Sequence, residues 1–287
     1  MDIPILYEDK DVLVLNKPSG LMVHGDGRSK EKTLTDWILK KYPKLKNVGE
    51  PWKVEREGET IFRPGIVHRL DKETSGVLVI AKNQKTFEFL KEQFSAPALE
   101  ITKGRLADRK NRVKKTYVAL VWGHVKNDEG VIDAPIARSK KDFRQWSAQR
   151  GRRGKEREAI TEYKVLKHLL MDADGKLINP DISVDQKKIS GISSLTLLEV
   201  KPRTGRTHQI RVHLKYINHP IVCDKLYAPK KPCPIPPPTL PLIKGEEKGG
   251  GLSRLALHAK SIEFTLPSGQ KIKAEAPLPN DFLHVIV

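Results

Sequence analysis

The sequence lacks the features of secreted and membrane proteins. Its 287 residues include only two cysteines, Cys223 and Cys233, which are too few for a disulfide framework in a chain of this size. No run approaches the roughly 18 consecutive apolar residues of a membrane span. The N-terminal segment, Met1-Asp2-Ile3-Pro4, lacks the basic-then-apolar pattern of a signal peptide. We therefore expect a cytoplasmic protein.

Signatures of cofactor, nucleotide and metal binding are also missing. The segment from Lys201 to His213 has a glycine turn, but it lacks the Gly-Lys-Ser/Thr ending of a P-loop. His208 and His213 are five residues apart, which is not the two-histidine spacing of a zinc protease. No Cys or Glu pattern nearby completes a metal site. We expect neither a cofactor nor a metal.

Acidic residues are in the minority. Lys and Arg number 53 against 35 Asp and Glu, which gives a net charge of +18. A protein can be basic for solubility alone, but this excess favours a polyanionic partner, because each neutralised phosphate releases counterions. The charge indicates nucleic acid. It does not distinguish RNA from DNA, or an enzyme from a coating protein.

Short apolar, β-branched runs of strand length recur along the chain. They are residues 12–15, 76–81, 117–122, 194–200, 262–266 and 271–276, and the last two flank a predicted hairpin turn at 267–270. Helical spacing predicts helices that begin at Thr33, after Asn83 and at Thr207. Asp36 suits a capping box with Thr33, and Asn218 suits the end of the third helix. The pattern predicts an α+β fold built on a substantial sheet.

Three stretches, 47–62, 140–158 and 229–251, are predicted loop insertions into a single domain that spans residues 1–287, because strand-like segments continue on both sides of each. The first is polar and the third is Pro-rich and then Gly-rich, a composition that disfavours packing. The second is strongly basic, with Arg150, Arg152, Arg153, Lys155 and Arg157. A run of like charges is usually solvated or disordered, and an RNA-gripping loop is the alternative.

Reactive residue types are densest between Gly65 and Gly76. Asp71 lies there beside the basic Arg69 and Lys72. A carboxylate in such a turn is most often a structural cap, although polar loops at strand ends are also where sites are built. A second cluster, from Lys201 to His213, combines three arginines with a helix start, which suits a phosphate or a carboxylate. Tyr117 alone is an ordinary half-buried tyrosine.

Together, these segments resemble the RluA family of pseudouridine synthases, in the family's order and over nearly the whole chain. The segments that carry the resemblance are Leu15-Asn16-Lys17-Pro18-Ser19-Gly20, His68-Arg69-Leu70-Asp71 with Thr74-Ser75-Gly76, Lys115-Thr116-Tyr117-Val118-Ala119, residues 203–213, His219-Pro220-Ile221, Leu257-His258-Ala259 and Ala276-Pro277-Leu278-Pro279. The resemblance implies a mixed, mainly antiparallel central sheet flanked by helices and loops. Many members of the family carry an N-terminal S4 domain, but the first predicted strand of this sequence begins close to Met1, so we expect the catalytic domain without an S4 domain. It also implies isomerisation of uridine to pseudouridine in ribosomal or transfer RNA. A lone catalytic domain favours a compact stem-loop as the target, and a monomer is the default expectation.

Residue roles follow from the resemblance at the matching positions. Asp71 matches the catalytic aspartate that attacks the target nucleoside. Tyr117 matches the tyrosine that packs on the target base, and Arg211 matches the basic residue that pairs with the catalytic carboxylate. Arg69 matches the arginine that enters the base stack when the target nucleotide flips out. The RNA-binding residues that we expect are His68, Arg69, Thr74, Arg203, Arg206, His208 and Gln209.

The chemistry agrees with these roles. A nucleophilic carboxylate must stay ionised where burial alone would raise its pKa, and an arginine partner counters that effect. Extruding a stacked uridine costs roughly a few kcal/mol, part of which an inserted Arg69 would offset. The isomerisation is redox-neutral, so the missing cofactor motifs agree with it. Two alternatives from other classes are a catalytically silent RNA-binding protein that kept the fold and a metal-dependent hydrolase.

Overall fold

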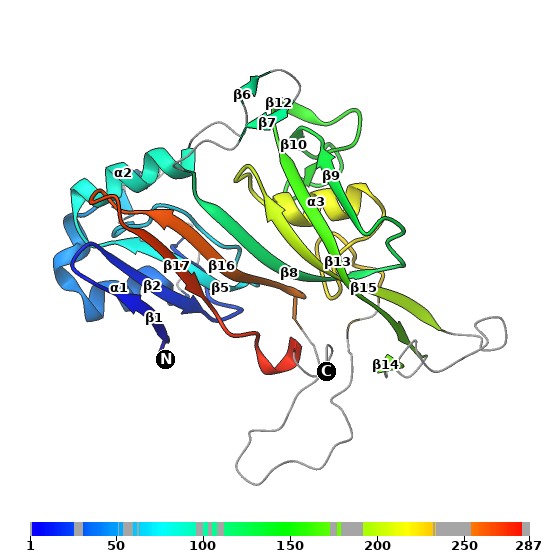
Figure 1. The fold of residues 1–287 in the computed structure, drawn as a ribbon, viewed down its shortest axis with the longest axis horizontal. Coiled ribbons are helices and arrows are strands. Elements are labelled where there is room, and N and C mark those ends of the chain that lie inside the picture. The colour runs from blue at the N-terminus through cyan, green and yellow to red at the C-terminus, as the bar shows by residue number, and fades with distance from the viewer. Residues whose placement is uncertain are drawn as a thin grey trace, which may run out of the picture. The chain divides into compact units, whose positions relative to one another are not determined.

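The chain forms two compact units, each with its own sheet segment and its own apolar core (Figure 1). The computed structural model describes residues 2–25, 31–50, 52–53, 60–61, 63–95, 100–102, 105–107, 112–172, 177–178, 192–231, 233 and 254–282. Unit 1 comprises Met1–Lys115 and Ala259–Ala276, and unit 2 comprises Thr116–His258 and Pro277–Val287.

Unit 1 is built on strands that pair in the order β1–β2–β5–β16–β17. Their bounds are Ile5–Glu8, Val12–Lys17, Ser75–Ala81, Leu257–Thr265 and Lys271–Glu275. The pairs β1–β2, β2–β5 and β16–β17 are antiparallel. The other elements are α1 (Leu34–Lys41), the 3-10 helix η1 (Pro43–Asn47), α2 (Gln84–Ser95), and the short pairs β3–β4 (Trp52–Lys53, Thr60–Ile61) and β6–β7 (Glu100–Thr102, Arg105–Ala107).

Both helices of unit 1 begin with side-chain caps. The Asp36 backbone N–H donates to Oγ1 of Thr33, and the Asp36 carboxylate accepts from the Thr33 N–H at 2.7 Å, which completes a capping box. At the start of α2, Oδ1 of Asn83 accepts from the Thr86 N–H. The apolar face of α2 then packs on β5, so the sequence places both helix starts correctly.

Unit 2 holds the longer strands. Strand β8 (Lys114–Trp122) pairs with β15 (Ser193–Pro202), which pairs with β13 (Ile160–Met171). Both β9 (Glu129–Asp133) and β14 (Leu177–Ile178) also pair with β13. A separate three-stranded sheet has the order β11 (Trp146–Ser147), β10 (Ile136–Arg138), β12 (Arg153–Arg157). All these pairs are antiparallel.

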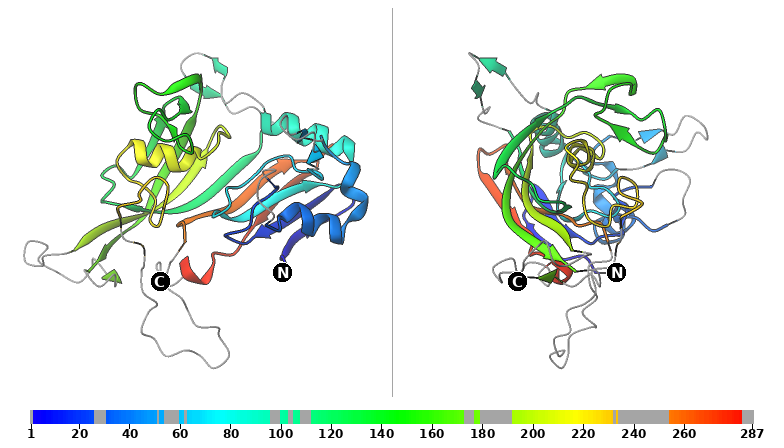
Figure 2. Two further views of the ribbon diagram at one scale, coloured as in Figure 1. Left: turned by 180° about the vertical axis from the view of Figure 1, so that it is seen from behind. Right: turned by 90° about the vertical axis from the view of Figure 1, so that its right-hand side faces the viewer.

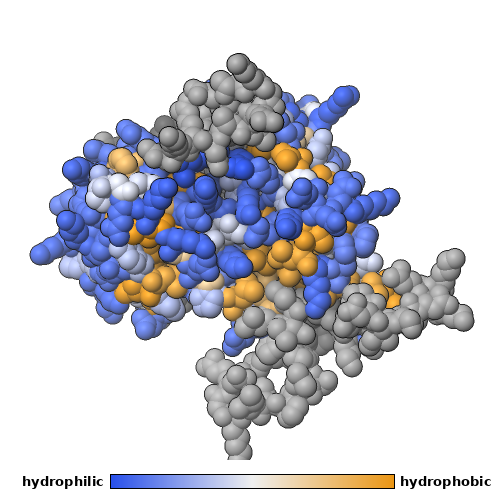
Figure 3. Space-filling model, in the orientation of Figure 1, coloured by the Kyte–Doolittle hydropathy of each residue, from blue (hydrophilic) through white to orange (hydrophobic). Residues whose placement is uncertain are grey.

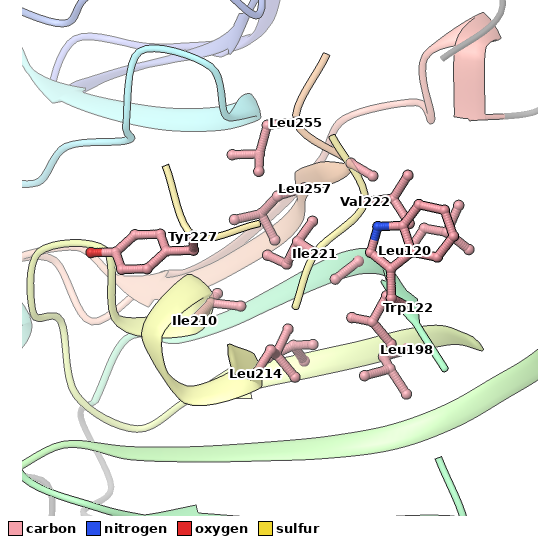
Figure 4. Packing of buried hydrophobic residues seen from close by; sticks show 14 of the residues in the cluster. Leu120, Trp122, Leu198, Ile210, Leu214, Ile221, Val222, Tyr227, Leu255 and Leu257 are labelled. Carbon is pink, nitrogen blue, oxygen red and sulfur yellow. The ribbon is translucent and has the colours of Figure 1, made fainter. Parts of the chain in front are cut away.

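One helix, α3 (Gln209–Tyr216), covers the long strands of unit 2. It contacts β11, β13 and β15, and the views in Figure 2 show it lying along the green strands. Ile210 and Leu214 of this helix pack into the core, together with Leu120 and Trp122 of β8 and Leu198 of β15 (Figure 4). This packing fixes the helix that carries Arg211.

Most predicted elements are confirmed. The six predicted strands correspond to β2, β5, β8, β15, β16 and β17, and the turn at 267–270 closes the β16–β17 hairpin. The third helix begins at Gln209 rather than Thr207, because His208 has the left-handed φ of 56°. Asn218, with φ of 66°, follows the end of that helix as predicted.

Two predictions need correction. The long strand β13 is absent from the predicted set, because a bulge between Val165 and Lys167 interrupts its alternation and leaves Leu166 49% exposed. Residues 140–158 are not a bare loop, since they contribute β11 and β12. Most of the stretches 47–62 and 229–251 lies outside the described residues.

Most of the face drawn in Figure 3 is hydrophilic, as the charge leads one to expect. None of the described helices is long and apolar enough to cross a membrane. The two cysteines are joined, since Cys223 and Cys233 form one disulfide across ten residues of sequence. This bond is a single cross-link rather than a framework.

Candidate active site

Asp71 lies half-buried in the loop that leads into β5. The Thr74 N–H donates to the Asp71 carbonyl at 3.1 Å, which closes a turn around the carboxylate. The strand then begins beside Gly76, whose φ is 109°. A Cβ added there would lie 2.2 Å from the carbonyl oxygen of Ala259 in β16. Only glycine permits this approach of the two strands, so the C-terminal end of the Asp71 loop is fixed where β5 begins.

The other side of the Asp71 loop is held by Lys17, whose side chain is fully buried. Its Nζ donates to the carbonyls of Pro18 and Leu21, both at 2.8 Å, and to the carbonyl of Lys72 at 3.1 Å. Ser19 adds a hydrogen bond from its Oγ to the Glu73 carbonyl. The segment after β2 therefore anchors the two residues that follow Asp71 in sequence.

Arg69 and His68 flank the candidate nucleophile. Arg69 is exposed, and its Nη1 lies 3.0 Å from Nε2 of His24. Nδ1 of His24 lies 2.8 Å from a carbonyl, so it carries the proton, and Nε2 accepts from the arginine. The His68 ring stacks on Phe94, and its Nε2 accepts from the Val79 N–H. Burial, with a smaller contribution from the charge of Lys115, lowers the pKa of His68 to about 3. His68 is therefore neutral and packed.

Thr74 is the last of the candidate residues in unit 1. Its side chain is 2% exposed, and its Oγ1 has no hydrogen-bond partner among the described residues. Buried hydroxyl groups are normally bonded. This hydroxyl lies three residues beyond Asp71 in a loop that is otherwise tightly bonded, which is consistent with a place beside a bound substrate.

In unit 2, Tyr117 is half-buried on β8, where it pairs with Val200 of β15 and packs against the apolar core. The strand therefore fixes the base of its ring. The resemblance assigns Tyr117 to the active site. Its location alone agrees with that role and with an ordinary strand residue, so the role stays a prediction.

Arg211 lies on α3 and is 7% exposed. Its Nε donates to Oδ2 of Asp224 at 2.7 Å, and its Nη2 donates to Oδ1 at 2.8 Å. The Asp224 side chain is itself fully buried. The resemblance predicts that Arg211 pairs with Asp71, which belongs to the other unit, and that pair stays a prediction. Asp224 is a second carboxylate that the sequence analysis did not identify.

The turn before α3 is bonded through Gln209. Its amide donates to the carbonyl of Ile160 and to Oγ1 of Thr161, and it accepts from Thr204 and from the Arg206 N–H. Gln209 is buried, so within unit 2 it organises the turn. An RNA contact by Gln209 stays a prediction.

The other predicted RNA-binding residues of unit 2 lie around the same turn. Arg203 pairs with Glu162 at 2.9 Å, and the exposed Arg206 donates from Nε to the carbonyl of Glu158. Nδ1 of His208 lies 3.0 Å from the hydroxyl of Tyr227. The turn therefore gathers Arg203, Arg206 and His208 at one end of α3.

Two residues of this arrangement were missed as functional candidates. Lys17 belongs to a recognised segment, yet nothing in its spacing indicates that a lysine would be fully buried. Asp224 lies 13 residues beyond Arg211, in a segment without helical or strand periodicity. Within the described part of the chain, no group of three or more His, Cys, Asp or Glu side chains is arranged to hold a metal ion.

Comparison with known proteins identifies the family of this chain. Residues 11–216 match the family model described as RNA pseudouridylate synthase. The uncharacterized RNA pseudouridine synthase YlyB of Bacillus subtilis is 34% identical over 287 residues, which cover 100% of this chain and 72% of that protein. The ribosomal large subunit pseudouridine synthase D of Borreliella burgdorferi is 36% identical over 226 residues, which cover 79% of this chain and only 55% of that protein.

A solved structure agrees with the sequence comparisons. Human RNA pseudouridylate synthase domain containing 4 is 27% identical with a TM-score of 0.58, and the match covers 98% of this chain and 91% of that one. The α+β fold and the mainly antiparallel sheet predicted from the sequence are thus confirmed, and neither alternative class is favoured. The chain belongs to the RluA family of RNA pseudouridylate synthases, the isomerases that convert uridine to pseudouridine in RNA.

Proposed function

We propose that this isomerase uses Asp71 as its nucleophile, with Tyr117 and Arg211 as the other catalytic residues. The observation that carries the assignment is the placement of Asp71. It is a half-buried carboxylate in a loop fixed by Lys17 on one side and by Gly76 on the other. Catalysis depends on holding the attacking group in one geometry, and these contacts provide that.

The reaction moves the uracil without any external reactant. The carboxylate of Asp71 attacks the target nucleoside, and the bond between N1 of uracil and C1′ breaks. The base turns and C5 bonds to C1′, and the bond that Asp71 formed breaks, which regenerates the carboxylate. C5 loses its proton and N1 gains one. Tyr117 packs on the base and serves the proton transfer, while Arg211 pairs with the carboxylate and orients it.

Arg69 has a separate role at the RNA helix. The target uridine must leave the base stack before its reacting atoms are accessible. Arg69 is exposed, and Nη1 of its guanidinium bonds to Nε2 of the neutral His24, which gives the guanidinium a defined position. We assign it to the space that the flipped nucleotide vacates.

The decisive test replaces Asp71 by alanine. We expect no detectable pseudouridine, measured by tritium release from RNA labelled at uridine C5, while RNA affinity stays within about tenfold because phosphate contacts dominate binding. Glu31→Gln is the matched control, since it removes an exposed carboxylate that pairs with Lys72 beside Asp71. It should keep full activity. An active Asp71→Ala enzyme would refute the assignment.

The three-stranded sheet β10–β12 is proposed as an RNA grip. Strand β12 is exposed throughout and carries Arg153 and Lys155. Arg138 and Arg157 lie over the ring of Trp146, at 4.5 and 5.6 Å from its centroid. Cationic side chains held on a rigid strand suit a phosphate backbone.

Neutralising the basic residues of this sheet should weaken RNA binding more than neutralising basic residues elsewhere. Arg150, Arg153 and Lys155 are exposed, whereas Arg152 is committed to Glu156 and to the carbonyl of Ala148. The triple change of those exposed residues to glutamine should reduce the slope of log Kd against log salt by about one for each phosphate that the protein no longer neutralises. The control neutralises Lys40, Lys44 and Lys271, which are exposed on unit 1. Equal slopes for the two triple variants would count against a grip at β12.

We propose large-subunit ribosomal RNA as the substrate, acted on in the cytoplasm by a monomer. The support is the similarity to the ribosomal large subunit pseudouridine synthase D of Borreliella, of which the chain spans 55%. Mapping pseudouridines in total RNA with and without the gene decides the substrate, and sites lost only from transfer RNA would overturn it. Disulfides are rare in the cytosol, so in a cytoplasmic protein we expect Cys223 and Cys233 to be alkylated in fresh lysates. Protection of both cysteines from alkylation would contradict a cytoplasmic location. Light scattering of the purified protein tests the monomer.

A further inference from the structure

We propose that Asp224 is a positioning residue that fixes the guanidinium of Arg211 in the orientation needed for catalysis. This inference rests on the catalytic role proposed for Arg211 above. It adds a residue that acts through the arginine rather than on the substrate.

The geometry of the pair is a two-point fork. Nε and Nη2 of Arg211 donate to different oxygens of Asp224, at 2.7 and 2.8 Å. Two parallel hydrogen bonds fix both the position and the plane of a guanidinium, whereas a single bond leaves it free to rotate. The plane of Arg211, and hence the direction of Nη1, is set by Asp224.

Asp224 is itself held before it binds the arginine. Its Oδ1 accepts from the backbone N–H groups of Leu226 and Tyr227, at 3.0 and 2.9 Å. Its carbonyl accepts from the Ala228 N–H, so the residue lies in a bonded turn. The carboxylate therefore has its orientation from the main chain, and it passes that orientation to Arg211.

An aromatic ring restrains the guanidinium from one face. Cζ of Arg211 lies 5.0 Å from the centroid of the Tyr227 ring, within the range of a cation–π contact. The Tyr227 hydroxyl accepts from the Trp146 N–H and is bonded to Nδ1 of His208. Figure 4 shows this ring beside the start of α3, next to Ile210. The guanidinium is thus restrained in its plane by Asp224 and across its face by Tyr227.

The burial of the Arg211–Asp224 pair indicates that it serves to orient the guanidinium rather than to stabilise the fold. A buried ion pair loses much of its Coulomb gain to desolvation, so it is a weak source of stability. Unit 2 contains a comparison in Arg254 and Asp281, which form the same fork at 2.6 and 2.8 Å but are 18% and 20% exposed. This second pair has no assigned catalytic role. It therefore serves as the control.

The test is Asp224→Asn, with Asp281→Asn as its matched control. Asparagine places an NH₂ group where one carboxylate oxygen accepted from Arg211, so two donors face each other and the guanidinium must turn. A misplacement of about 1 Å costs about 100-fold in rate. We expect that loss in the single-turnover rate at saturating enzyme, with RNA Kd within about threefold. Asp281→Asn should lower Tm by less, because its pair is partly exposed, and should keep the rate within about twofold.

Two further variants separate this inference from the proposed function. If Arg211→Gln is inactive while folded Asp224→Asn keeps the wild-type rate, the positioning role is overturned and the catalytic role of Arg211 stands. If Arg211→Gln is fully active, the catalytic role fails, and the positioning role fails with it. Combining both changes should be no worse than Arg211→Gln alone, because Asp224 acts through Arg211. Additive losses would overturn the inference.

A milder change covers the case in which Asp224→Asn does not fold. Asp224→Glu keeps a carboxylate to pair with the buried arginine but moves it by one methylene. We expect a folded protein whose rate is reduced at unchanged RNA affinity. A wild-type rate in this variant would overturn the positioning role, since the orientation would then not matter.

Discussion

The two units hold their candidate catalytic residues in different ways. In unit 1 the Asp71 loop is fixed through main-chain atoms, namely carbonyls gathered by Lys17 and the close approach at Gly76. In unit 2 Arg211 is fixed through side chains, namely Asp224 and Tyr227. The first arrangement depends on close main-chain packing and on the hydrogen bonds of Lys17, and the second depends on the charge of a buried carboxylate. Added bulk or a lost donor should therefore damage unit 1, and changes of charge or protonation should damage unit 2.

The largest effect should come from Gly76→Ala in unit 1. The new Cβ would lie 2.2 Å from the Ala259 carbonyl oxygen at a φ of 109°, and the atoms that it meets belong to the main chain rather than to a flexible side chain. We expect a loss of about 4 kcal/mol or more in the free energy of unfolding, measured by urea denaturation. Gly269→Ala is the control, since its φ is 86° but nothing lies within 4 Å. It should cost about 1 kcal/mol. Similar losses in the two variants would show that φ, not space, limits unit 1.

The next effect should come from Lys17→Met, which keeps the apolar stem and removes the ammonium. The carbonyls of Pro18 and Leu21 would lose this donor, and the Lys72 carbonyl, which joins the Asp71 loop to the segment after β2, would keep its hydrogen bond from the Gly20 N–H. We expect about 3 kcal/mol of lost stability and a fall of about tenfold to 100-fold in the single-turnover rate. Lys82→Met removes the partly exposed pair with Glu8 in the same unit and should cost about 1 kcal/mol or less. A wild-type rate for folded Lys17→Met would show that the hydrogen bonds of Lys17 do not affect catalysis.

The same contrast explains which parts of the fold were predictable from sequence. Strands β2, β5 and β8 are short apolar runs, and α1 carries its own capping box, so local signals locate them. Strand β13 has a bulge and exposed positions that break its alternation, so its pairing with β15 decides its structure. The basic strand β12 has no apolar face at all, and only pairing with β10 identifies it.

The candidate site divides in a similar way. Asp71, Tyr117 and Arg211 lie in recognisable segments, and their types are those that the chemistry needs. The residues that position them were not predictable, because both act through tertiary contacts. Lys17 bonds to main-chain carbonyls, and Asp224 bonds to Arg211, which lies 13 residues away in sequence. Periodicity reports on which face of an element is buried. It does not report which buried polar groups meet.

A pH titration sharpens the charge side of the comparison. His213 of unit 2 is fully buried, and its Nδ1 accepts from Thr161 while Nε2 donates to the Ala134 carbonyl. Burial lowers its pKa from 6.5 to about 4. The unfolded chain therefore binds the proton more readily, and stability is lost as pH falls from 6.5 to 4, by up to about 3 kcal/mol.

His213→Gln should remove that part of the acid sensitivity, since glutamine keeps a donor and an acceptor and does not titrate. The measurement is the urea midpoint at pH 7.5, 5.5 and 4.5. A loss that remains as the pH falls further has contributions from His68 of unit 1, whose pKa is about 3, and from Glu8, Asp9 and Asp142, whose pKa values are also lowered. If His213→Gln and the wild type lose stability in parallel, His213 does not carry the acid sensitivity, and its assignment to this buried group of unit 2 is wrong.

The smallest effect should come from Thr33→Ala, which removes one half of the capping box of α1. Helix caps of this kind contribute about 1 kcal/mol, so we expect a loss of that size in the free energy of unfolding, measured by urea denaturation. The Thr33 hydroxyl bonds to Thr35 and Asp36 at the start of α1, so the isomerisation rate should stay unchanged. Thr33→Ser, which keeps the capping hydroxyl, is the control and should cost only a fraction of that loss. A rate loss in Thr33→Ala would mean that all of unit 1, rather than the loop held by Lys17 and Gly76, controls the position of Asp71.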